Sequence, residues 1–504
     1  MLLKSSIIVA FFTMISRLFG LSRELFIASS FGSSIIADCV NIAFKFPNLF
    51  RRIFGEGGLS ILFIPIFSRK LLDSKDAARQ FSGKVLSLLF IFLVVFSAML
   101  QLIMPCLMIF IAPGFCKIQE QYELAILLCR ITTPYLIFVS ITAIFGGMLN
   151  SVKKFAAFAF VPVIMNVCVI VFTYLVQNIF SSQFAIAYSL ILAGLLQVIF
   201  MWLCLIREKL YFSPSFNFYK DPDIIKLFKN MGPAAMGSGT QQLNLFVSQS
   251  IASFIPGAIS ILSYAERLYQ LPLAIIGVTL GTVLLPELSQ IYKKKDIISA
   301  NNLQNNAITI SLIFSIPAMI GLFILSRPII HLIYERGSFS MEDTNRTASA
   351  LSAFSLGLPA FVMVKIFTSS FYANDDTKTP MKIMFYSLLF NTLLNISLMI
   401  PFKNTGIAIG SSIASWYSVW LLNKYAQCKN NFKINTQTMR CIYKIVISAS
   451  IMTVVLLILN YFCYDFYYSC NNLVKLFTLF LSITITALVY LLMLYFFKIH
   501  LLFY

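Results

Sequence analysis

Residues 37–68 read ADCVNIAFKFPNLFRRIFGEGGLSILFIPIFS, and they place charged side chains inside a segment otherwise apolar enough to lie in a lipid bilayer. Asp38, Lys45 and Arg52 are spaced by seven residues, so a helix would carry them near one stripe. Pro47 and the glycines that follow would allow this helix to kink or unwind, which is tolerated at membrane depth only where backbone lines protein or water. The stretch therefore favours a helix that forms the wall of a hydrated cavity.

The composition is that of a polytopic membrane protein. The chain has 504 residues, of which 59% are hydrophobic and only 11% charged, and its mean hydropathy is +0.86. These values exclude a soluble multidomain enzyme. Apolar runs predict an all-α fold with about 14 transmembrane helices, which begin near residues 5, 35, 83, 122, 155, 182, 228, 257, 302, 343, 379, 404, 440 and 472.

A weak internal repeat divides the predicted helices into two lobes. Ala37-Asp38 and Phe46-Pro47 are echoed by Ala265-Glu266 and Leu271-Pro272. Each copy falls in the second span of a six-span block, so the two blocks would share one orientation, as in some transporters. We expect an N-terminal lobe at 1–215, a pseudo-symmetric C-terminal lobe at 216–430, and an appended pair of C-terminal helices at 431–504.

Charges in the loops predict the topology. Most of the 38 basic residues fall in the even-numbered loops, and few fall in the odd-numbered ones. By the positive-inside rule the basic side is cytoplasmic, which would place both termini in the cytoplasm. Topology thus accounts for the net charge of +19 without a nucleic-acid partner.

Thirteen charged residues are expected at membrane depth, and cations outnumber acids among them. They are Arg17, Arg23, Lys45, Arg51, Arg52, Arg130, Arg267 and Lys365, with Glu24, Asp38, Glu56, Glu266 and Glu287. Each charge would cost roughly 2.5–3.5 kcal/mol at the bilayer centre, so they cannot all face lipid. A hydrated, cation-lined cavity suited to an anion is one explanation, and internal salt bridges that tie helices together are the other. On the first explanation the substrate-binding residues are Arg17, Arg23, Asp38, Lys45, Asn48, Arg51, Arg52, Glu56, Glu266, Arg267 and Lys365.

Two of these cations carry local alternatives. For Arg23 the alternatives to reaching the cavity are pairing with Glu24 and snorkelling to the interface. Lys365 is either functional or paired across helices. Arginine suits a pyrophosphate because its guanidinium gives bidentate hydrogen bonds and stays protonated. No nucleophile–base cluster is visible, and the ten cysteines and two histidines lack metal-ligand spacing. We therefore expect no catalytic residue, metal or cofactor.

Several motifs resemble one known family. They are SRLFG at 16–20 with Arg23, AFKFPNLFRRIFGEG at 43–57, AERL at 265–268, and the pairs at 271–272, 277–278, 281–282 and 285–286. Together they closely resemble the MurJ (MviN) lipid II flippases of the MOP exporter superfamily. The resemblance implies essential charges at Arg17, Arg23, Asp38, Arg52 and Arg267, a role for Lys45, and a groove for the lipid tail beside the last two helices. One departure is Gln270, a position that is often acidic in the family, and it leaves Arg267 more dependent on Glu266.

The resemblance also implies a function and a location. The chain would move lipid II, the undecaprenyl-pyrophosphate-linked peptidoglycan precursor, from the inner to the outer leaflet of the bacterial cytoplasmic membrane by alternating access. Its partners would be lipid II and membrane lipids, with the cell-wall synthesis machinery as a further candidate. The alternatives are another MOP-type exporter, of drugs or polysaccharide lipids, and a non-transporting scaffold for envelope assembly. An exporter of cationic drugs should be rich in membrane carboxylates, and this chain has the opposite bias.

Overall fold

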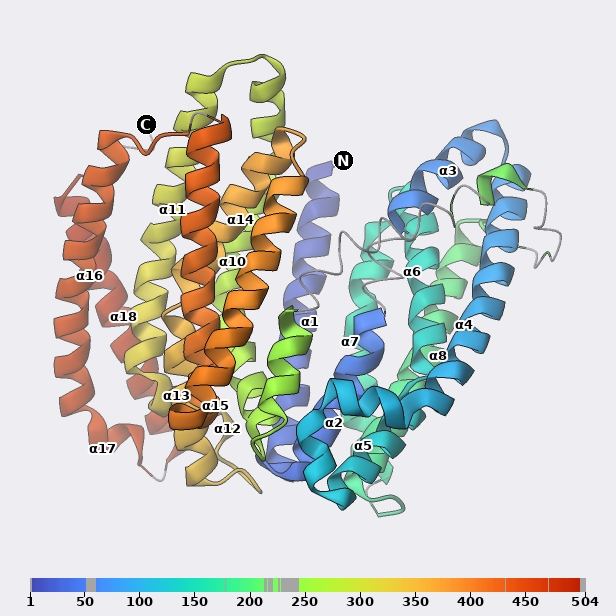
Figure 1. Cartoon of the computed structure of the whole chain (residues 1–504), viewed down its shortest axis with the longest axis horizontal. Helices are drawn as coiled ribbons and strands as arrows, with labels where there is room; N and C mark the ends of the chain where they lie inside the picture. The colour runs from blue at the N-terminus through green and yellow to red at the C-terminus, as the bar shows by residue number, and fades with distance from the viewer. Residues whose placement is uncertain are drawn as a thin grey trace. The chain divides into compact units, whose positions relative to one another are not determined.

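The computed structural model describes residues 2–50, 60–176, 178–212, 215, 221–224, 227, 244–430, 432–469 and 471–498. Within these ranges the secondary structure is helical, with no strand (Figure 1). An apolar bilayer has no water for backbone N–H and C=O groups, and a helix pairs them within one segment. The all-α expectation is confirmed.

Two units divide the chain, Met1–Gly257 and Ala258–Tyr504. Unit 1 contains α1 (Leu2–Phe31), α2 (Ile35–Phe50), α3 (Ser60–Asp73), α4 (Lys75–Ile111), η2 (Pro113–Lys117), α5 (Gln119–Thr132), α6 (Tyr135–Ser151), α7 (Phe155–Val176) and α8 (Ser182–Arg207). In this unit α7 packs against both α1 and α8, α6 packs on α8, and α2 packs on α5. The three-part division at residues 215 and 430 stays a prediction.

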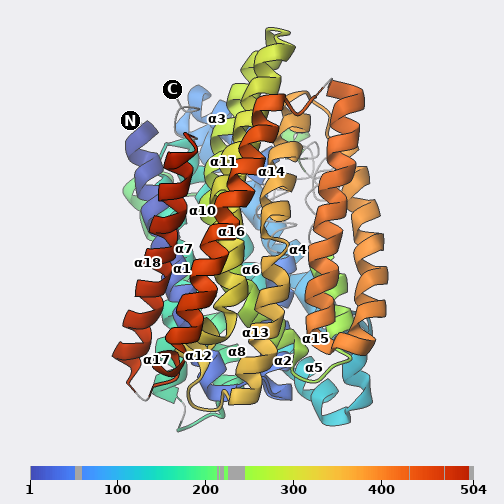
Figure 2. The ribbon, with the colours of Figure 1, turned by 90° about the vertical axis from the view of Figure 1, so that its left-hand side faces the viewer.

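Unit 2 is built around α10 (Ala258–Lys293), α11 (Ile297–Ile324), α13 (Met341–Ser355) and α14 (Leu358–Ala373). Helix α10 packs against each of the other three. The unit also contains α12 (Ser326–Tyr334), α15 (Lys378–Asn430), α16 (Thr436–Phe462), α17 (Tyr464–Tyr467) and α18 (Asn472–Phe496). Helices α16 and α18 lie side by side, and α16 also packs on α11 (Figure 2).

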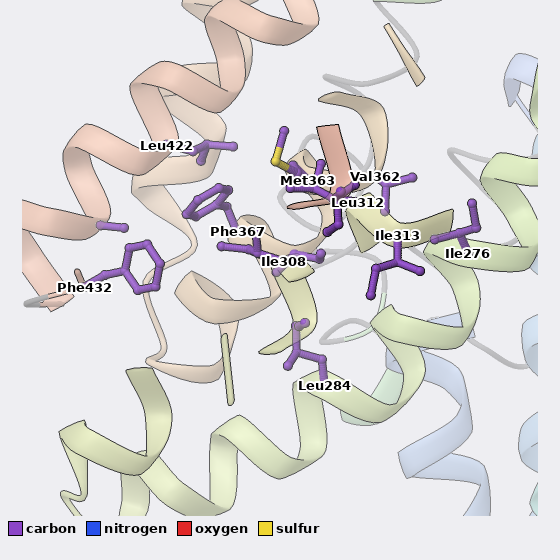
Figure 3. Packing of buried hydrophobic residues seen from close by; sticks show 14 of the residues in the cluster. Ile276, Leu284, Ile308, Leu312, Ile313, Val362, Met363, Phe367, Leu422 and Phe432 are labelled. Atoms are coloured by element: carbon purple, nitrogen blue, oxygen red, sulfur yellow. The ribbon is translucent and has the colours of Figure 1, made fainter. Parts of the chain in front are cut away.

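The core of unit 2 joins helices that are distant in the chain. Figure 3 shows Ile276 of α10 and Ile313 of α11 on one side of this core, and Phe367 of α14 close to Phe432. The rings of Phe367 and Phe432 meet edge to face with their centroids 5.7 Å apart. Aromatic pairs of this geometry add about 0.5–1.5 kcal/mol beyond the area that they bury.

Eight helices in the described ranges are long and apolar enough to cross a membrane, or nine if α13 and α14, which meet at a bend of 41°, are one span. The count of about 14 is therefore not confirmed. The spans expected from residues 379 and 404 both fall within α15, which is interrupted at Lys403 by non-helical backbone angles (φ 50°, ψ −131°).

Candidate functional site

Arg23 of α1 is buried in unit 1 among polar and aromatic partners. One guanidinium nitrogen donates to Oε1 of Glu24 at 2.6 Å, and another donates to Oδ1 of Asn166 on α7 at 3.1 Å. The guanidinium also lies 4.8 Å from the ring centroid of Phe44 on α2. Asn166 in turn donates to the backbone oxygen of Ser16 at 3.3 Å. Of the alternatives for Arg23, the structure shows the pairing with Glu24, and Arg23 contacts residues of three helices.

Asp38 is fully buried at the start of α2, with 0% of its surface exposed. Its Oδ2 accepts a hydrogen bond from the backbone N–H of Gly257 at 2.8 Å. Gly257 has φ +77°, and a Cβ there would overlap the backbone oxygen of Ser33. Because only glycine adopts this backbone at low cost, the carboxylate and the glycine together hold residue 257 beside α2.

The other predicted site residues that the structure describes in unit 1 are partly buried. Arg17 lies on α1, and Lys45 and Asn48 lie on α2. Asn48 donates its amide N–H to the oxygen of Phe44 in its own helix at 2.8 Å. Pro47 lies inside α2, which stays helical to Phe50. Arg51, Arg52 and Glu56 lie outside the described residues.

Glu266 and Arg267 lie side by side in the sequence of α10, and both are partly buried. Gln270, one turn further, donates to Oε1 of Glu266 at 2.9 Å. The amide that stands where an acid was expected therefore holds the neighbouring carboxylate by a hydrogen bond. Tyr269, the residue before Gln270, is buried. The centroid of its ring lies 5.0 Å from that of Phe354 on α13.

Lys365 of α14 is partly buried against α10. A Cβ on Gly277 would lie 3.0 Å from its Cδ and 3.2 Å from its Nζ. The missing side chain of Gly277 therefore leaves room for the Lys365 side chain to pack against α10. Since Gly277 is ten residues after Arg267, the ammonium lies about 15 Å further along the α10 axis than Arg267 at 1.5 Å per residue.

Two further charges expected at membrane depth are exposed. Arg130, near the end of α5, donates through Nε to the oxygen of Gln101 at 3.0 Å. Glu287 lies close to the end of α10. Within the described ranges no group of three potential metal ligands occurs.

Sequence reasoning did not identify Asn166, Gly257 or Gly277 as parts of these arrangements. Asn166 carries a usable signal, because a polar residue in the apolar run of α7 needs a partner across helices. A glycine at a chain reversal signals positive φ only weakly. Nothing in the sequence indicates which side chain lies against Gly277.

Comparisons with known proteins agree with one another. The family described as lipid II flippase MurJ matches residues 27–479. The probable lipid II flippase MurJ of Rickettsia prowazekii is 54% identical over 474 residues, which is 94% of this chain and 93% of that protein. A solved structure described as lipid II flippase MurJ, inward closed conformation, has a TM-score of 0.81 at 29% identity and covers 98% of this chain and 99% of its own. An inward-facing multidrug resistance MATE family transporter of the MOP superfamily has a TM-score of 0.68 at 14% identity, over 84% of this chain and 98% of that one, which shows a shared fold alone.

Proposed function

The chain belongs to the lipid II flippase MurJ family, and we propose that its partly buried cations receive the diphosphate of lipid II as that molecule crosses the membrane. The protein is a transporter and not an enzyme. It moves the undecaprenyl-pyrophosphate-linked peptidoglycan precursor from the inner to the outer leaflet by alternating access.

Burial sorts the site residues into two groups, and this is the observation that carries the proposal. Arg17, Lys45, Arg267 and Lys365, on α1, α2, α10 and α14, keep part of their surface exposed. Each of the four contacts the diphosphate at some stage of its passage, because a ligand can reach it. Arginine supplies paired, charge-assisted hydrogen bonds to phosphate, and lysine supplies a mobile point charge.

The second group positions the first. Arg23 and Asp38 are 7% and 0% exposed, and each is hydrogen-bonded to a group on another part of unit 1. Arg23 connects α1 to α7, the helix that packs along α1, and so sets the position of Arg17. Asp38 holds the first turn of α2, the helix that carries Lys45.

Substrate occupancy would also bias the conformation. A diphosphate attracts each of these cations, so a conformation in which a cation approaches the ligand is favoured more when the ligand is bound than when it is absent.

The proposed function also implies a location and a class of partners. A multi-pass lipid II flippase resides in the cytoplasmic membrane, and the excess of basic residues in the expected even-numbered loops favours both termini on the cytoplasmic side. The enzymes that consume lipid II at the outer leaflet form the class of protein partner that the product requires. Export of cationic drugs gains no support from a shared fold at 14% identity, and the excess of membrane cations opposes it.

Single alanine substitutions of Arg17, Lys45, Arg267 and Lys365 test the proposal. Each variant is produced in cells depleted of their own flippase, and outer-leaflet lipid II is measured together with the amount of folded protein in the membrane. We expect normal protein levels and reduced lipid II exposure. The matched control is K294Q/K295Q, which removes two exposed charges from the turn after α10. Normal exposure of lipid II in all four alanine variants would contradict the assignment.

A further inference from the structure

A cavity of about 300 Å³ lies within unit 1 where α6 ends, α7 begins and α8 ends. Four charged residues line it: Lys153, Lys154, Arg207 and Glu208. The remaining lining residues are small or apolar, namely Leu149, Phe155, Ala156, Ala157 and Cys204. The cavity is thus charged on one part of its wall and apolar on the rest. None of these residues belongs to the proposed diphosphate site.

A tight turn places the two lysines at the cavity. Helix α6 ends at Ser151, and Lys153 takes a left-handed backbone conformation with φ 63°. The N–H groups of Lys153 and Lys154 donate to the oxygens of Asn150 and Leu149 at 3.0 and 2.9 Å. These hydrogen bonds fix the turn, so both lysines leave it next to the first residues of α7.

Cations dominate the lining. Nζ of Lys154 lies 2.8 Å from Oε1 of Glu208, and the two side chains are 56% and 32% exposed. Glu208 offsets one of the three cations, which leaves a net charge of +2 among the lining residues. An exposed pair of this kind contributes little to stability, so an incoming anion can recruit Lys154 without a large loss.

An apolar surface continues from the cavity along α8. Leu203 lies one turn before Arg207 on the same face and is 51% exposed, and Trp202 beside it is 46% exposed. Phe200 lies further along that face, with its ring 5.6 Å from the ring of Phe160 on α7. A cation at the helix end, with exposed leucine and tryptophan about one turn further into the helix, matches the passage from headgroup to apolar leaflet.

We propose that this cavity binds the phosphate of an anionic phospholipid headgroup, with the acyl chains along Leu203 and its neighbours. Arg207 gives the paired hydrogen bonds that a phosphate oxygen pair accepts, and Lys153 adds a point charge. The volume is at the small end of ligand sites, which fits a glycerophosphate group and is too small for a disaccharide peptide. The choice of leaflet rests on the proposed function, whose topology puts these loops on the cytoplasmic side, where anionic lipids concentrate.

Binding of labelled phosphatidylglycerol to the full chain in neutral detergent micelles tests the proposal, with labelled phosphatidylcholine as the comparison lipid. Each basic residue near the phosphate is worth about fivefold in affinity, so K153Q/R207Q should bind phosphatidylglycerol about 25-fold more weakly. E208Q removes the only acid of the lining and should bind it about fivefold more tightly. The control K294Q/K295Q, with the same charge change in unit 2, should bind as the unchanged protein does.

The gain expected for E208Q keeps the test independent of folding defects, because a misfolded variant does not bind more tightly. Equal affinities for K153Q/R207Q and its control would overturn the proposal, as would equal binding of the two phospholipids. Displacement of the label by lipid II at lower concentrations than by unlabelled phosphatidylglycerol would assign the cavity to lipid II instead. Since the assay measures phospholipid binding and no transport, a failure of this proposal is distinguishable from a failure of the proposed flippase function.

Discussion

Replacing Arg23 with methionine should destabilise unit 1 strongly, because the arginine is buried and bonded on two sides. The substitution removes the 2.6 Å contact with Glu24 and the 3.1 Å hydrogen bond to Asn166, and it also removes the cation–π contact with Phe44. The side chains of Arg23 and Glu24 are only 9% and 8% exposed. Removing one partner of a buried ion pair costs about 3–5 kcal/mol. Asn166→Ala, which leaves the ion pair in place, should cost less, about 1.5–3 kcal/mol.

The double variant R23M/E24Q sharpens this prediction. It removes both charges of the pair, and replacing a whole buried pair is often close to neutral. We therefore expect R23M/E24Q to be more stable than R23M, which is the opposite of additive damage. Thermal unfolding of the purified proteins in one detergent, at one heating rate, measures all four midpoints.

Two results would refute this reasoning. One is an unchanged unfolding midpoint for R23M, and the other is a double variant no more stable than R23M. Transport by the double variant tests the role of Arg23 as well. If Arg23 matters only for the stability of unit 1, R23M/E24Q should retain lipid II exposure, whereas a stable but inactive double variant would show that Arg23 is also needed to position Arg17 or to contact substrate.

Three further predictions follow from local geometry. Gly277→Ala should displace the Lys365 side chain by a few tenths of an ångström, because a Cβ would lie 3.0 Å from its Cδ. We expect a near-normal unfolding midpoint with reduced lipid II exposure at the outer leaflet. If K365A is impaired but Gly277→Ala exposes lipid II normally, this prediction is wrong. Gly257→Ala should cost at least about 1 kcal/mol, because φ is +77° and the Cβ would overlap a backbone oxygen, and a thermal midpoint equal to that of the unchanged protein would speak against it. Partial burial opposes ionisation of Asp376, but hydrogen bonds from Lys429 and the adjacent turn outweigh it and lower its pKa from 3.8 to about 2. The ion pair of Asp376 and Lys429 should therefore stabilise the fold above about pH 4 and lose this contribution as the pH falls toward 2. Because Lys429 is half exposed, the difference in unfolding free energy between the unchanged protein and D376N should be about 1 kcal/mol or less at neutral pH. This difference should vanish near pH 2.

Apolar runs predicted the helical class because length and hydropathy are local properties of the chain. Helix breaks were harder to predict, since they depend on packing. Residues 343–373 read as one span, but the structure bends them by 41° between α13 and α14. The spans expected from residues 379 and 404, by contrast, are separated in the structure by the non-helical backbone at Lys403, two residues after Pro401, and Ser418 of the second half donates to Ser387 of the first at 2.6 Å.

The candidate site was predictable in composition and not in arrangement. Charged residues inside apolar segments could be named from the sequence alone, because their cost in a bilayer is a property of the residue type. The pairing of Arg23 with Glu24 was accessible as well, because the two are adjacent in the chain. The hydrogen bond from Gly257 to Asp38 spans 219 residues, so only the tertiary fold brings the two together.

The internal repeat shows that two acids at matching positions of the two copies can have different structural roles. Asp38 and Glu266 occupy matching positions in the two copies, yet Asp38 is fully buried and bound to the backbone N–H of Gly257, whereas Glu266 is partly buried and held by Gln270 of its own helix. A backbone N–H carries no charge to change and cannot rotate away as a side chain can, so Asp38 is suited to a fixed structural contact. A side-chain amide can rotate away. The acid of the second copy is therefore the less constrained of the two, and under the proposed function it is the one that can move with Arg267.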